Sequence, residues 1–324
     1  MYSLTIIGGG NVACGYDSPN DSNIITHVHG ALLHPKIQLN AIVELNKQRR
    51  KYIKKKWGSS FKVFSNLKNC VKKYKSNIVV ISTPTKSHFK NIEELLNLYN
   101  PNLIIVEKPI VANIDEYENL NKLLKKTKVK IITHFNRRFD PSMTTLTKVL
   151  NKEKKIHHFY GTFSKGLIHN GSHMIDLINR LMGNVNKIEY LNKKITSKDI
   201  FGKFLIKTKK STGIISNIKS NKLGVFDLVI YTDKLKIDII NHRKNIEISH
   251  VKYNKKIKNQ ITYSKVKILK KTLNQWGLNL YDYIIKVINS DILYNKLKKE
   301  QNILNQLIFE TQEKFLTKEN YKNY

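Results

Sequence analysis

Three glycines stand near the start of the chain at a spacing that can cradle phosphate groups. Residues 4–7 form a short apolar run, and Gly8, Gly10 and Ala13 follow it in the pattern Gly-x-Gly-x-x-Ala. In such a turn, Gly8 allows the tight bend, Gly10 lets the backbone come close to a pyrophosphate, and Ala13 keeps helix and strand together. The helix that follows would point its N-terminus toward the phosphates. The pattern alone also fits a plain loop, so the prediction of a dinucleotide site depends on the surrounding elements.

An acidic residue, Glu44, follows the next apolar run, residues 39–43. At the end of the second strand of a dinucleotide-binding domain, a carboxylate can accept hydrogen bonds from the adenosine ribose hydroxyls. Such an acid favours NAD over NADP. Arg49 and Arg50 lie a few residues further on and could hold a 2′-phosphate, so NADP stays open. The other interpretation of Glu44 is an ordinary acid at the end of a strand.

The separation between Gly10 and Glu44 is longer than the usual distance of about 20 residues. The surplus lies in residues 14–23, which are rich in Gly, Asp, Ser, Asn and Pro and therefore predict turns. We expect the helix to resume at about residue 24.

Apolar runs and helical segments alternate through the first part of the chain. Strands are predicted at residues 62–64, 78–82, 103–106 and 129–133, and helices at 66–74, 88–98 and 115–125. The alternation predicts an α/β fold that begins with a Rossmann-type, doubly wound parallel sheet over residues 1–133. Ligands bind beyond the carboxyl ends of the strands in such a sheet. The residues at those ends are Gly8, Glu44, Thr83, Pro84, Glu107, Lys108, Pro109 and His134.

Four motifs in this order resemble those of the Gfo/Idh/MocA family of glucose–fructose oxidoreductases, inositol dehydrogenases and related sugar dehydrogenases. They are the glycine turn at residues 8–13, Val-Ile-Ser-Thr-Pro-Thr-Lys-Ser-His at 80–88, Val-Glu-Lys-Pro at 106–109, and Gly-Leu-Ile-His-Asn-Gly-Ser-His-Met-Ile-Asp at 166–176. A fifth segment, Phe-Asn-Arg-Arg-Phe-Asp-Pro at 135–141, is similar to the domain-crossing segment of inositol dehydrogenases. The resemblance spans essentially the whole chain and ends in two helices near residues 278–287 and 302–316.

The resemblance implies that Lys108 lies beside the nicotinamide and the reacting carbon, ahead of a cis proline at Pro109. An ammonium group there can hydrogen-bond the substrate oxygen and stabilise the charge that grows on it. His173 corresponds to the family's histidine that exchanges a proton with the substrate hydroxyl, and its near-neutral intrinsic pKa suits that task. The alternatives are a solvated lysine and a histidine bonded to the backbone at a helix start.

His173 is expected on a helix over residues 172–181, where it forms a polar stripe with Asp176 and Arg180. Many members of the family have an aspartate four residues before this histidine, and here that position is His169. His169 either replaces the aspartate or marks a branch with a different set of hydrogen-bond donors. The substitution also leaves open a sensor that binds a dinucleotide without catalysis.

The resemblance assigns roles to further positions, and it implies no metal ligands. Cofactor contacts are implied for Gly8, Gly10, Asn11, Val12, Ala13, Glu44, Thr83, Pro84, His88, Glu107, Lys108 and Asn136. Substrate contacts are implied for Lys108, Arg138, Asn170, His173 and Asp176, and catalytic roles for Lys108, His173 and His169. The two cysteines, Cys14 and Cys70, have no metal-type spacing and suggest neither a disulfide framework nor a zinc site.

The second part of the chain predicts an α+β domain over residues 134–324. Short strands with alternating apolar residues are predicted at 155–163, 203–207, 212–216, 226–231 and 235–239. The alternation is typical of an open, mostly antiparallel sheet with one covered face. Such a sheet can form one wall of a substrate pocket, and in the family its free face often serves dimerisation, so we expect a homo-oligomer.

The chain is strongly basic, with 58 Lys and Arg against 24 Asp and Glu and a formal net charge of +34. Such a charge is typical of nucleic-acid or anionic-membrane binding. Only six of the basic residues are arginine, however, and base readout and bidentate phosphate contacts favour arginine. Lysine spread along the chain indicates a solvated surface that favours anionic ligands. We expect no nucleic-acid or membrane partner, and keep a nucleic-acid-binding protein as a third alternative.

A length of 324 residues allows two domains of ordinary size. The start has no basic leader, and no apolar stretch approaches the roughly 20 residues that a bilayer span needs, so we expect a cytoplasmic protein. Together these features predict an NAD(P)-dependent oxidoreductase that moves hydride between nicotinamide and a carbinol carbon. The substrate would be a sugar, an inositol or a nucleotide sugar, phosphorylated or not.

Overall fold

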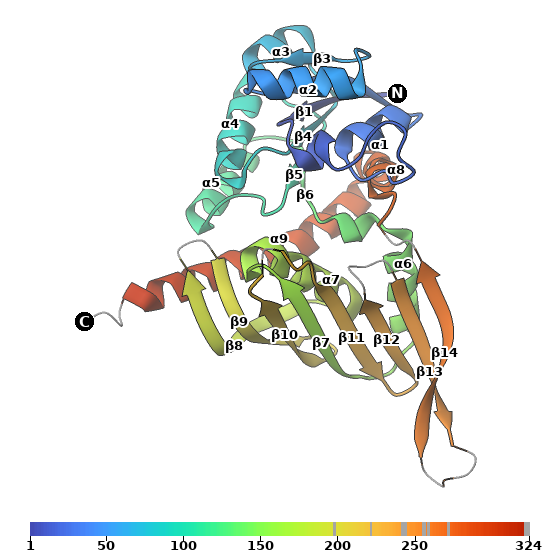
Figure 1. The fold of residues 1–324 in the computed structure, drawn as a ribbon. Helices are drawn as coiled ribbons and strands as arrows, with labels where there is room; N and C mark the ends of the chain where they lie inside the picture. The colour runs from blue at the N-terminus through green and yellow to red at the C-terminus, as the bar shows by residue number, and fades with distance from the viewer. Residues whose placement is uncertain are drawn as a thin grey trace. The chain divides into compact units, whose positions relative to one another are not determined.

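The computed structural model describes residues 1–196, 199–220, 222–240, 245–254, 257, 260–270 and 273–320. The chain forms two compact units, drawn in Figure 1. The first unit contains Met1–Phe139 and Asn274–Gln306, and the second contains Asp140–Leu273 and the chain from Leu307 on. The expected contiguous division at residues 133 and 134 therefore differs from the structural one, because a late segment returns to the first unit.

Six parallel strands form the sheet of the first unit, in the order β3-β2-β1-β4-β5-β6. They are β1 (Tyr2–Ile7), β2 (Ile37–Val43), β3 (Lys62–Phe64), β4 (Ile78–Ile81), β5 (Leu103–Glu107) and β6 (Lys130–His134). All four residues of β4 are fully buried, as expected for a strand with helices on both faces. The predicted doubly wound parallel sheet is confirmed, and its strand order reverses between β1 and β4.

Helices cover both faces of this sheet. In Figure 1, α4 and α5 lie on one side of the strands, and α1 and α8 lie on the other. The bounds are α1 (His27–Leu33), α2 (Lys47–Trp57), α3 (Leu67–Lys73), α4 (His88–Leu98), α5 (Ile114–Leu124) and α8 (Trp276–Ile288). Asparagine side chains cap the starts of three of them, at Asn46, Asn66 and Asn113. No helix among the described residues is long and apolar enough to cross a membrane.

Two glycines explain why α8 belongs to the first unit. Any side chain at Gly30 of α1 would overlap the backbone of Gly277 at the start of α8. The two helices can therefore approach closely only because both positions lack a Cβ atom. Tyr281 of α8 reinforces the contact, since its hydroxyl donates to the carbonyl oxygen of His27 at 3.2 Å.

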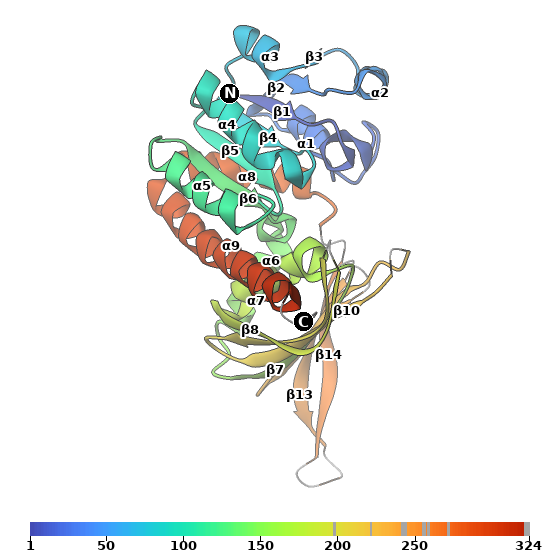
Figure 2. The same ribbon diagram turned by 90° about the vertical axis from the view of Figure 1, so that its left-hand side faces the viewer.

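The long helix α9 (Asp291–Asn320) begins eleven residues before the predicted segment and protects the outer edge of β6. Figure 2 shows it running beside α5 and β6. The Gln301 side chain takes the place of a neighbouring strand: its Oε1 accepts from the Thr133 amide at 3.0 Å, and its Nε2 donates to the Thr133 carbonyl at 2.7 Å. The Tyr294 hydroxyl accepts from the Ile131 amide at 3.2 Å. These bonds satisfy an edge that would otherwise be open to another strand.

The sheet of the second unit has eight strands in the order β14-β13-β12-β11-β7-β10-β9-β8. They are β7 (Ile156–Ser164), β8 (Val185–Thr196), β9 (Asp199–Thr208), β10 (Thr212–Ile218), β11 (Phe226–Thr232), β12 (Leu235–Ile240), β13 (Asn245–Tyr253) and β14 (Ile261–Lys270). All pairs are antiparallel except β7 with β10, so the predicted mostly antiparallel sheet is confirmed.

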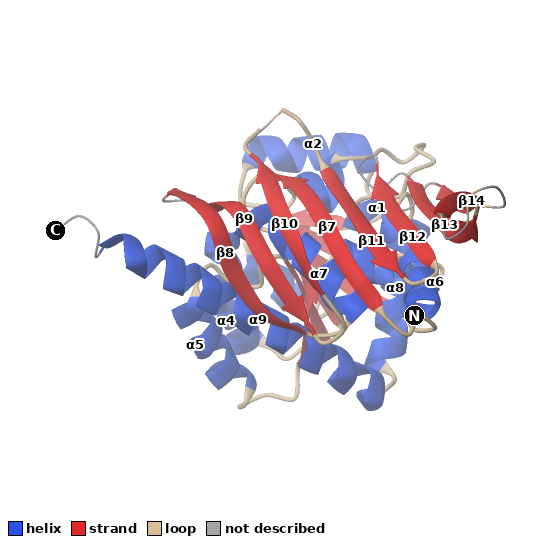
Figure 3. Cartoon of the chain, turned by 90° about the horizontal axis from the view of Figure 1, so that it is seen from below, coloured by secondary structure: helices blue, strands red, loops and turns tan. Residues whose placement is uncertain are grey.

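Residues along the central strands of this sheet alternate between buried and half-buried, as in β11 and β12. The alternation indicates that one face carries the core. Figure 3 shows the strands in front and the helix α7 (Ser172–Met182) behind them. Helix α6 (Pro141–Leu150) packs against α7, and Asp140 caps its start by accepting from the Ser142 amide.

Candidate active site

The glycine turn after β1 has the shape that a pyrophosphate requires. Gly8 has φ +98°, and a Cβ atom there would lie 2.8 Å from the backbone of Ser82 and Thr83. Only glycine fits that position. At Gly10, in contrast, the nearest atom to a Cβ would be the Ser82 carbonyl oxygen at 3.8 Å, so the backbone is accessible from one side. The turn therefore fits a diphosphate group, as its sequence predicts.

The helix expected after the turn is only one turn long. It is a five-residue π-helix, η1 (Asn11–Gly15), and the regular helix α1 begins at His27 rather than at about residue 24. The start is set by Thr26, whose side chain accepts from the His29 amide. The alignment of peptide dipoles toward a phosphate is accordingly shorter here than in an uninterrupted dinucleotide-binding helix.

The insertion between η1 and α1 is held by one buried carboxylate. Asp17 accepts from the Ile25 amide at 2.6 Å, from the Thr26 hydroxyl at 2.5 Å, and lies 3.0 Å from His29 Nδ1. Asp17 and His29 are both buried. Asp17 thus ties the insertion to the start of α1.

Glu44 lies against the glycine turn, at the carboxyl end of β2. Its Oε2 accepts from the Gly9 amide at 2.8 Å, and its Oε1 accepts from the Asn46 amide at 2.8 Å. A carboxylate fixed here has the position that contacts an adenosine ribose in this fold. Glu44 follows β2 directly, and two backbone donors fix its orientation.

Arg49 and Arg50, the two arginines that could bind the 2′-phosphate of NADP, have different hydrogen-bond partners. Arg49 donates from Nε to the Gly9 carbonyl at 2.6 Å and from Nη2 to Asn11 Oδ1 at 3.3 Å, and its guanidinium lies over the Tyr52 ring at 4.6 Å. Arg50 donates from Nη1 to the carbonyl oxygens of Glu44 and Leu45. Arg49 therefore lies directly at the glycine turn, whereas Arg50 braces the backbone behind it.

His88 joins the turns that follow β4 and β5. Its Nε2 lies 2.8 Å from the Thr83 carbonyl oxygen, and its Nδ1 lies 2.9 Å from the Pro109 carbonyl oxygen. Both partners are acceptors, so a singly protonated ring donates to only one of them at a time. The Asn91 side chain donates to Thr83 Oγ1 at 2.8 Å. His88 is buried, and its contacts position Thr83 and Pro109.

Lys108 follows β5 directly and is half-buried. Its peptide bond to Pro109 is cis, as the resemblance implied. Two other predicted site residues lie in the short helix η3 (Asn136–Phe139), which follows β6. Asn136 is half-buried, and its Oδ1 lies 3.5 Å from Arg137 Nη1. Arg138, a predicted substrate contact, is buried and paired with Glu300 of α9 at 2.9 Å.

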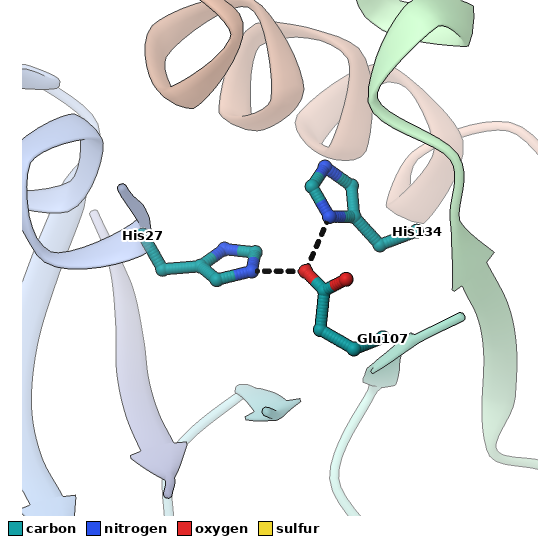
Figure 4. Close-up of side chains that lie close together, drawn as sticks. All are labelled: His27, Glu107 and His134. Carbon is teal, nitrogen blue, oxygen red and sulfur yellow. Dashed lines mark hydrogen bonds and ion pairs between the residues drawn. The ribbon is translucent and has the colours of Figure 1, made fainter. Parts of the chain in front are cut away.

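Glu107 accepts hydrogen bonds from two buried histidines that sequence spacing did not connect with it (Figure 4). His27 Nε2 and His134 Nδ1 lie 2.9 Å and 2.6 Å from the same oxygen, Oε1. Burial by itself raises the pKa of Glu107, but the contacts with His134 and His27 outweigh it and hold that pKa well below its usual range. Burial also lowers the pKa of His27. The result is a half-buried carboxylate that is held in its charged form.

Aromatic rings enclose these three side chains, which we call the Glu107 triad. Trp276 of α8 lies with its ring centroid 5.2 Å from that of His27 and 4.7 Å from that of His134. Phe139 stacks on His134 with centroids 5.6 Å apart. The donor atoms of the triad lie within 4.8 Å of one another, a grouping that can hold a cation although the sequence shows no metal-type spacing.

In the second unit, His173 lies in the first turn of α7 and is half-buried. The predicted helix is confirmed, and its apolar residues Met174, Leu177, Ile178 and Leu181 are buried. Asp176 is also buried, which differs from an exposed polar stripe. Arg180 donates to Thr144 Oγ1 of α6 at 3.0 Å, so this end of the stripe faces a neighbouring helix.

The segment before His173 is a π-helical turn, η4 (Leu167–Gly171), which contains His169 and Asn170. His169 is exposed, with Nε2 3.4 Å from Lys165 Nζ. Asn170 donates from Nδ2 to the Ser164 carbonyl oxygen at 3.0 Å. Lys165 itself has φ +65°, an uncommon backbone conformation for a residue with a side chain.

Asp199 of β9 fixes this turn and was not foreseen from the sequence. Its Oδ1 accepts from the Ile168 amide at 2.8 Å, and its Oδ2 accepts from the His169 amide at 3.1 Å. Any side chain at Gly166 would overlap the Asp199 carboxylate. The only sequence signal for Asp199 is that acidic residues are scarce, 24 in the chain, and this does not identify the turn that it contacts.

Comparisons with known proteins agree with this arrangement. A putative NADPH-dependent oxidoreductase from Desulfitobacterium hafniense has a TM-score of 0.73 at 15% identity, over 97% of this chain and 96% of that one. A mutant 3-ketoreductase from Actinomadura kijaniata, in complex with TDP-benzene and NADP, has a TM-score of 0.71 at 11% identity, over 95% of each chain. An oxidoreductase from Agrobacterium radiobacter, in complex with NAD+, L-tartaric acid and magnesium, has a TM-score of 0.67 at 14% identity, over 95% of this chain and 94% of that one.

At such low identity, these likenesses show a shared fold. None of the curated proteins that were compared matches the chain. Residues 4–135 match the model of an oxidoreductase family with an NAD-binding Rossmann fold. This stretch carries the glycine turn, Glu44 and the Glu107-Lys108-Pro109 motif, and over these residues the chain matches the Gfo/Idh/MocA oxidoreductase family.

Proposed function

We propose that the protein is an NAD(P)-dependent oxidoreductase that acts on a carbinol carbon of a sugar, an inositol or a nucleotide sugar. The observation that carries the proposal is the position of Lys108, directly after the carboxyl end of β5. Ligands of doubly wound sheets bind at that edge. The 3-ketoreductase of the same fold holds TDP-benzene and NADP, which supports a nucleotide-linked substrate as one of the classes.

The residues of the first unit fit a nicotinamide dinucleotide. The turn at Gly8 and Gly10 would hold its pyrophosphate, and Glu44 would accept hydrogen bonds from its adenosine ribose. When bound, the nicotinamide supplies a carbon that accepts or gives a hydride. We propose a preference for NAD over NADP, because the Glu44 carboxylate would repel a 2′-phosphate at the position where it accepts ribose hydroxyls.

Two side chains of this chain would act on the substrate. In the direction of oxidation, a carbinol loses a hydride from carbon and a proton from its hydroxyl, and a carbonyl bond forms. We assign to Lys108 a hydrogen bond to the reacting oxygen, which also stabilises negative charge on it. We assign to His173 the acceptance of the hydroxyl proton, which it returns during reduction. Asp199 is a positioning residue, because it fixes the turn that leads into His173.

A second candidate function is a sensor that binds the dinucleotide without catalysis. The observation that favours it is His169, which occupies the place of the aspartate found in many members of the family. His169 is exposed and lies near Lys165, so the local charge differs in sign from that of a carboxylate. The presence of both Lys108 and His173 favours the enzyme.

A two-step experiment separates these functions. Mass spectrometry of the purified protein tests for retained nicotinamide dinucleotide, and a screen of inositols, hexoses and nucleotide sugars then follows nicotinamide absorbance. The proposal predicts a retained or titratable cofactor and turnover of at least one compound class. Binding of cofactor with turnover that Lys108→Ala leaves unchanged would contradict the assigned site. Binding with no turnover in either direction would favour the sensor.

A further inference from the structure

The Glu107 triad lies at the half of the first sheet that the adenosine does not use. In a sheet of order 3-2-1-4-5-6, a dinucleotide binds across the point where the order reverses, one mononucleotide to each half. Glu44 marks the adenosine half, at the end of β2. Glu107 ends β5 and His134 ends β6, so both lie at the carboxyl edge of the opposite half. The triad therefore belongs to the nicotinamide half of the unit.

The hydrogen-bond pattern indicates that the triad carries one negative charge. Each histidine points one nitrogen at Glu107 Oε1, where an N–H is required. The other nitrogens, His27 Nδ1 and His134 Nε2, are buried with no hydrogen-bond partner among the described residues. A proton on either would create a buried donor without an acceptor, which costs free energy. Two neutral imidazoles and one carboxylate satisfy the pattern.

The same three side chains fit a metal ion less well. Zinc holds nitrogen and oxygen ligands at about 2.0–2.2 Å in a tetrahedron, which keeps the ligand atoms roughly 3.4 Å apart. In the triad, both nitrogens lie at hydrogen-bond distance from a single oxygen, 2.9 Å and 2.6 Å away. Two donors on one acceptor describe this geometry directly, and the aromatic rings of Trp276 and Phe139 enclose the group.

We propose that the negative charge of Glu107 makes this unit bind the oxidised form of its nicotinamide cofactor more tightly than the reduced form. The inference rests on the proposed function, because it requires that a nicotinamide dinucleotide binds. The oxidised ring is a cation and the reduced ring is neutral, while the rest of the molecule is the same. An anion in a poorly screened environment attracts only the cationic form. His27 and His134 are positioning residues, since their hydrogen bonds keep the carboxylate charged and fixed.

Lys108 is the nearest cation in sequence and acts in the opposite direction. Both residues are half-buried, and the Glu107 side chain is 13% accessible. The Lys108 ammonium offsets part of the attraction by Glu107. This opposition supplies a second test, because removing Lys108 should strengthen the discrimination that removing Glu107 abolishes.

The test measures the dissociation constants of NAD+ and NADH separately by titration calorimetry, without substrate. We expect Glu107→Gln to lower the ratio of the NADH constant to the NAD+ constant by about tenfold, the scale of one lost charge at moderate screening. Glu107→Asp keeps the charge and should keep most of the ratio. Glu44→Gln is the matched control: it removes a carboxylate from the adenosine half, so it should weaken both forms equally.

The outcomes are distinguishable. If neither form of the cofactor binds to the wild-type protein, the proposed function fails; if both bind and Glu107→Gln leaves the ratio unchanged, this inference alone fails. Should Glu107→Gln not fold, Lys108→Met tests the same electrostatic effect, because it removes the opposing positive charge. If the ratio of the NADH to the NAD+ dissociation constant does not rise in Lys108→Met, the proposal is overturned. A stoichiometric transition metal in the purified protein, lost in His27→Gln, would also overturn it and assign the triad to a metal.

Discussion

At the scale of single residues, the carboxylate of Glu44 decides which dinucleotide fits. Its two oxygens are oriented by the amides of Gly9 and Asn46, so it cannot turn away from a ligand without breaking both bonds. We predict that wild-type protein binds NADH more tightly than NADPH, because a 2′-phosphate would meet this fixed negative charge. Titration of both cofactors, followed by fluorescence, measures the preference.

Two variants separate the roles of Glu44 and Arg49 in that preference. Glu44→Ser should narrow the gap between NADH and NADPH, because the repulsive charge is gone. Arg49→Ala should weaken both cofactors, since Arg49 also braces the Gly9 carbonyl and Asn11. Tighter binding of NADPH by the wild-type protein, lost in Arg49→Ala, would show instead that Arg49 reads the 2′-phosphate and that the assignment of Glu44 is wrong.

The Glu107 triad also predicts a pH dependence for the stability of the first unit. Burial lowers the pKa of His27 below its usual 6.5, so the unfolded chain takes up a proton there that the folded chain does not. Stability should therefore be full above about pH 6.5 and fall as the pH drops below it. The lowered pKa of Glu107 acts in the same direction at more acidic pH, below its usual value of 4.5.

Thermal unfolding between about pH 5 and 8 measures the effect of His27. The His27→Gln variant retains an N–H donor for Glu107 and lacks the titrating ring, so its unfolding temperature should change less over this range. The control is a replacement of His157, an exposed histidine of the other unit that pairs with Asp233. An equal slope in wild-type and His27→Gln proteins would contradict the prediction.

The sequence predicts some of these site residues and not others, for a physical reason. Gly8, Gly10 and Glu44 follow from spacing, because a turn and two neighbouring strand ends lie close in the chain. His27 and Glu107 are 80 residues apart and meet only through the fold. Asp199 and Ile168 are 31 residues apart and likewise meet only through the fold. A local sequence pattern does not show which distant residues meet in the fold. The Glu107 triad and the contact of Asp199 with the η4 turn are therefore visible only in the structure.

At the scale of elements, Asp199 connects β9 to the turn before His173. The Asp199 carboxylate accepts from the backbone amides of Ile168, His169 and Ile200. Asp199→Asn leaves one accepting oxygen and places an NH2 group against a backbone donor. We predict that this turn is destabilised by about 1 kcal/mol, the lower end of the cost of an unsatisfied polar group, because Asp199 is half-buried. Hydrogen exchange of peptides that cover residues 166–173 should become faster.

The matched control for this prediction is Asp233→Asn. Asp233 is an exposed acid in the same unit, paired with His157 at 2.6 Å, and it does not contact the η4 turn. Its replacement should leave exchange at residues 166–173 unchanged. Exchange that is unaffected in Asp199→Asn would show that the turn does not depend on the carboxylate.

Elements of continuous burial were the easiest to predict. The strands β3 to β6 differ from their predicted bounds by at most one residue at either end, since each is a short apolar run in the core. The return of α8 was not predicted, because it depends on Gly30 and Gly277, which are far apart in the chain. The early start of α9 follows from Tyr294 and Gln301, whose polar groups complete β6 and give no apolar signal.

At the scale of the whole molecule, the net charge of +34 is a property of composition more than of a site. Charge spread over many lysines gives a diffuse field, and few arginines are available to read base edges. We predict that duplex DNA binds weakly, without sequence preference, and with an affinity that falls steeply as salt rises. Fluorescence anisotropy with two unrelated duplexes at several salt concentrations measures this. Nanomolar binding of one duplex at physiological salt would contradict it.

We propose that Lys108 and His173 both take part in hydride transfer. We predict that Lys108→Ala and His173→Ala each keep the fold and the affinity for the uncharged reduced cofactor, because neither residue contributes to a core. Each should lower turnover by at least about 100-fold, the usual scale for a charge-stabilising or acid–base group. His169→Asp, which restores the common aspartate, should preserve or raise turnover if His169 only fills that place.

The most direct measurement is the steady-state turnover of the wild-type protein and these three variants, on a substrate identified by the screen, with circular dichroism and cofactor titration as controls. We expect Lys108→Ala and His173→Ala to lose turnover while they still bind the nicotinamide cofactor. We expect His169→Asp to retain activity. Wild-type turnover in both alanine variants would contradict the proposed active site. Loss of turnover in His169→Asp together with a mild effect of His173→Ala would transfer the role of the base to His169.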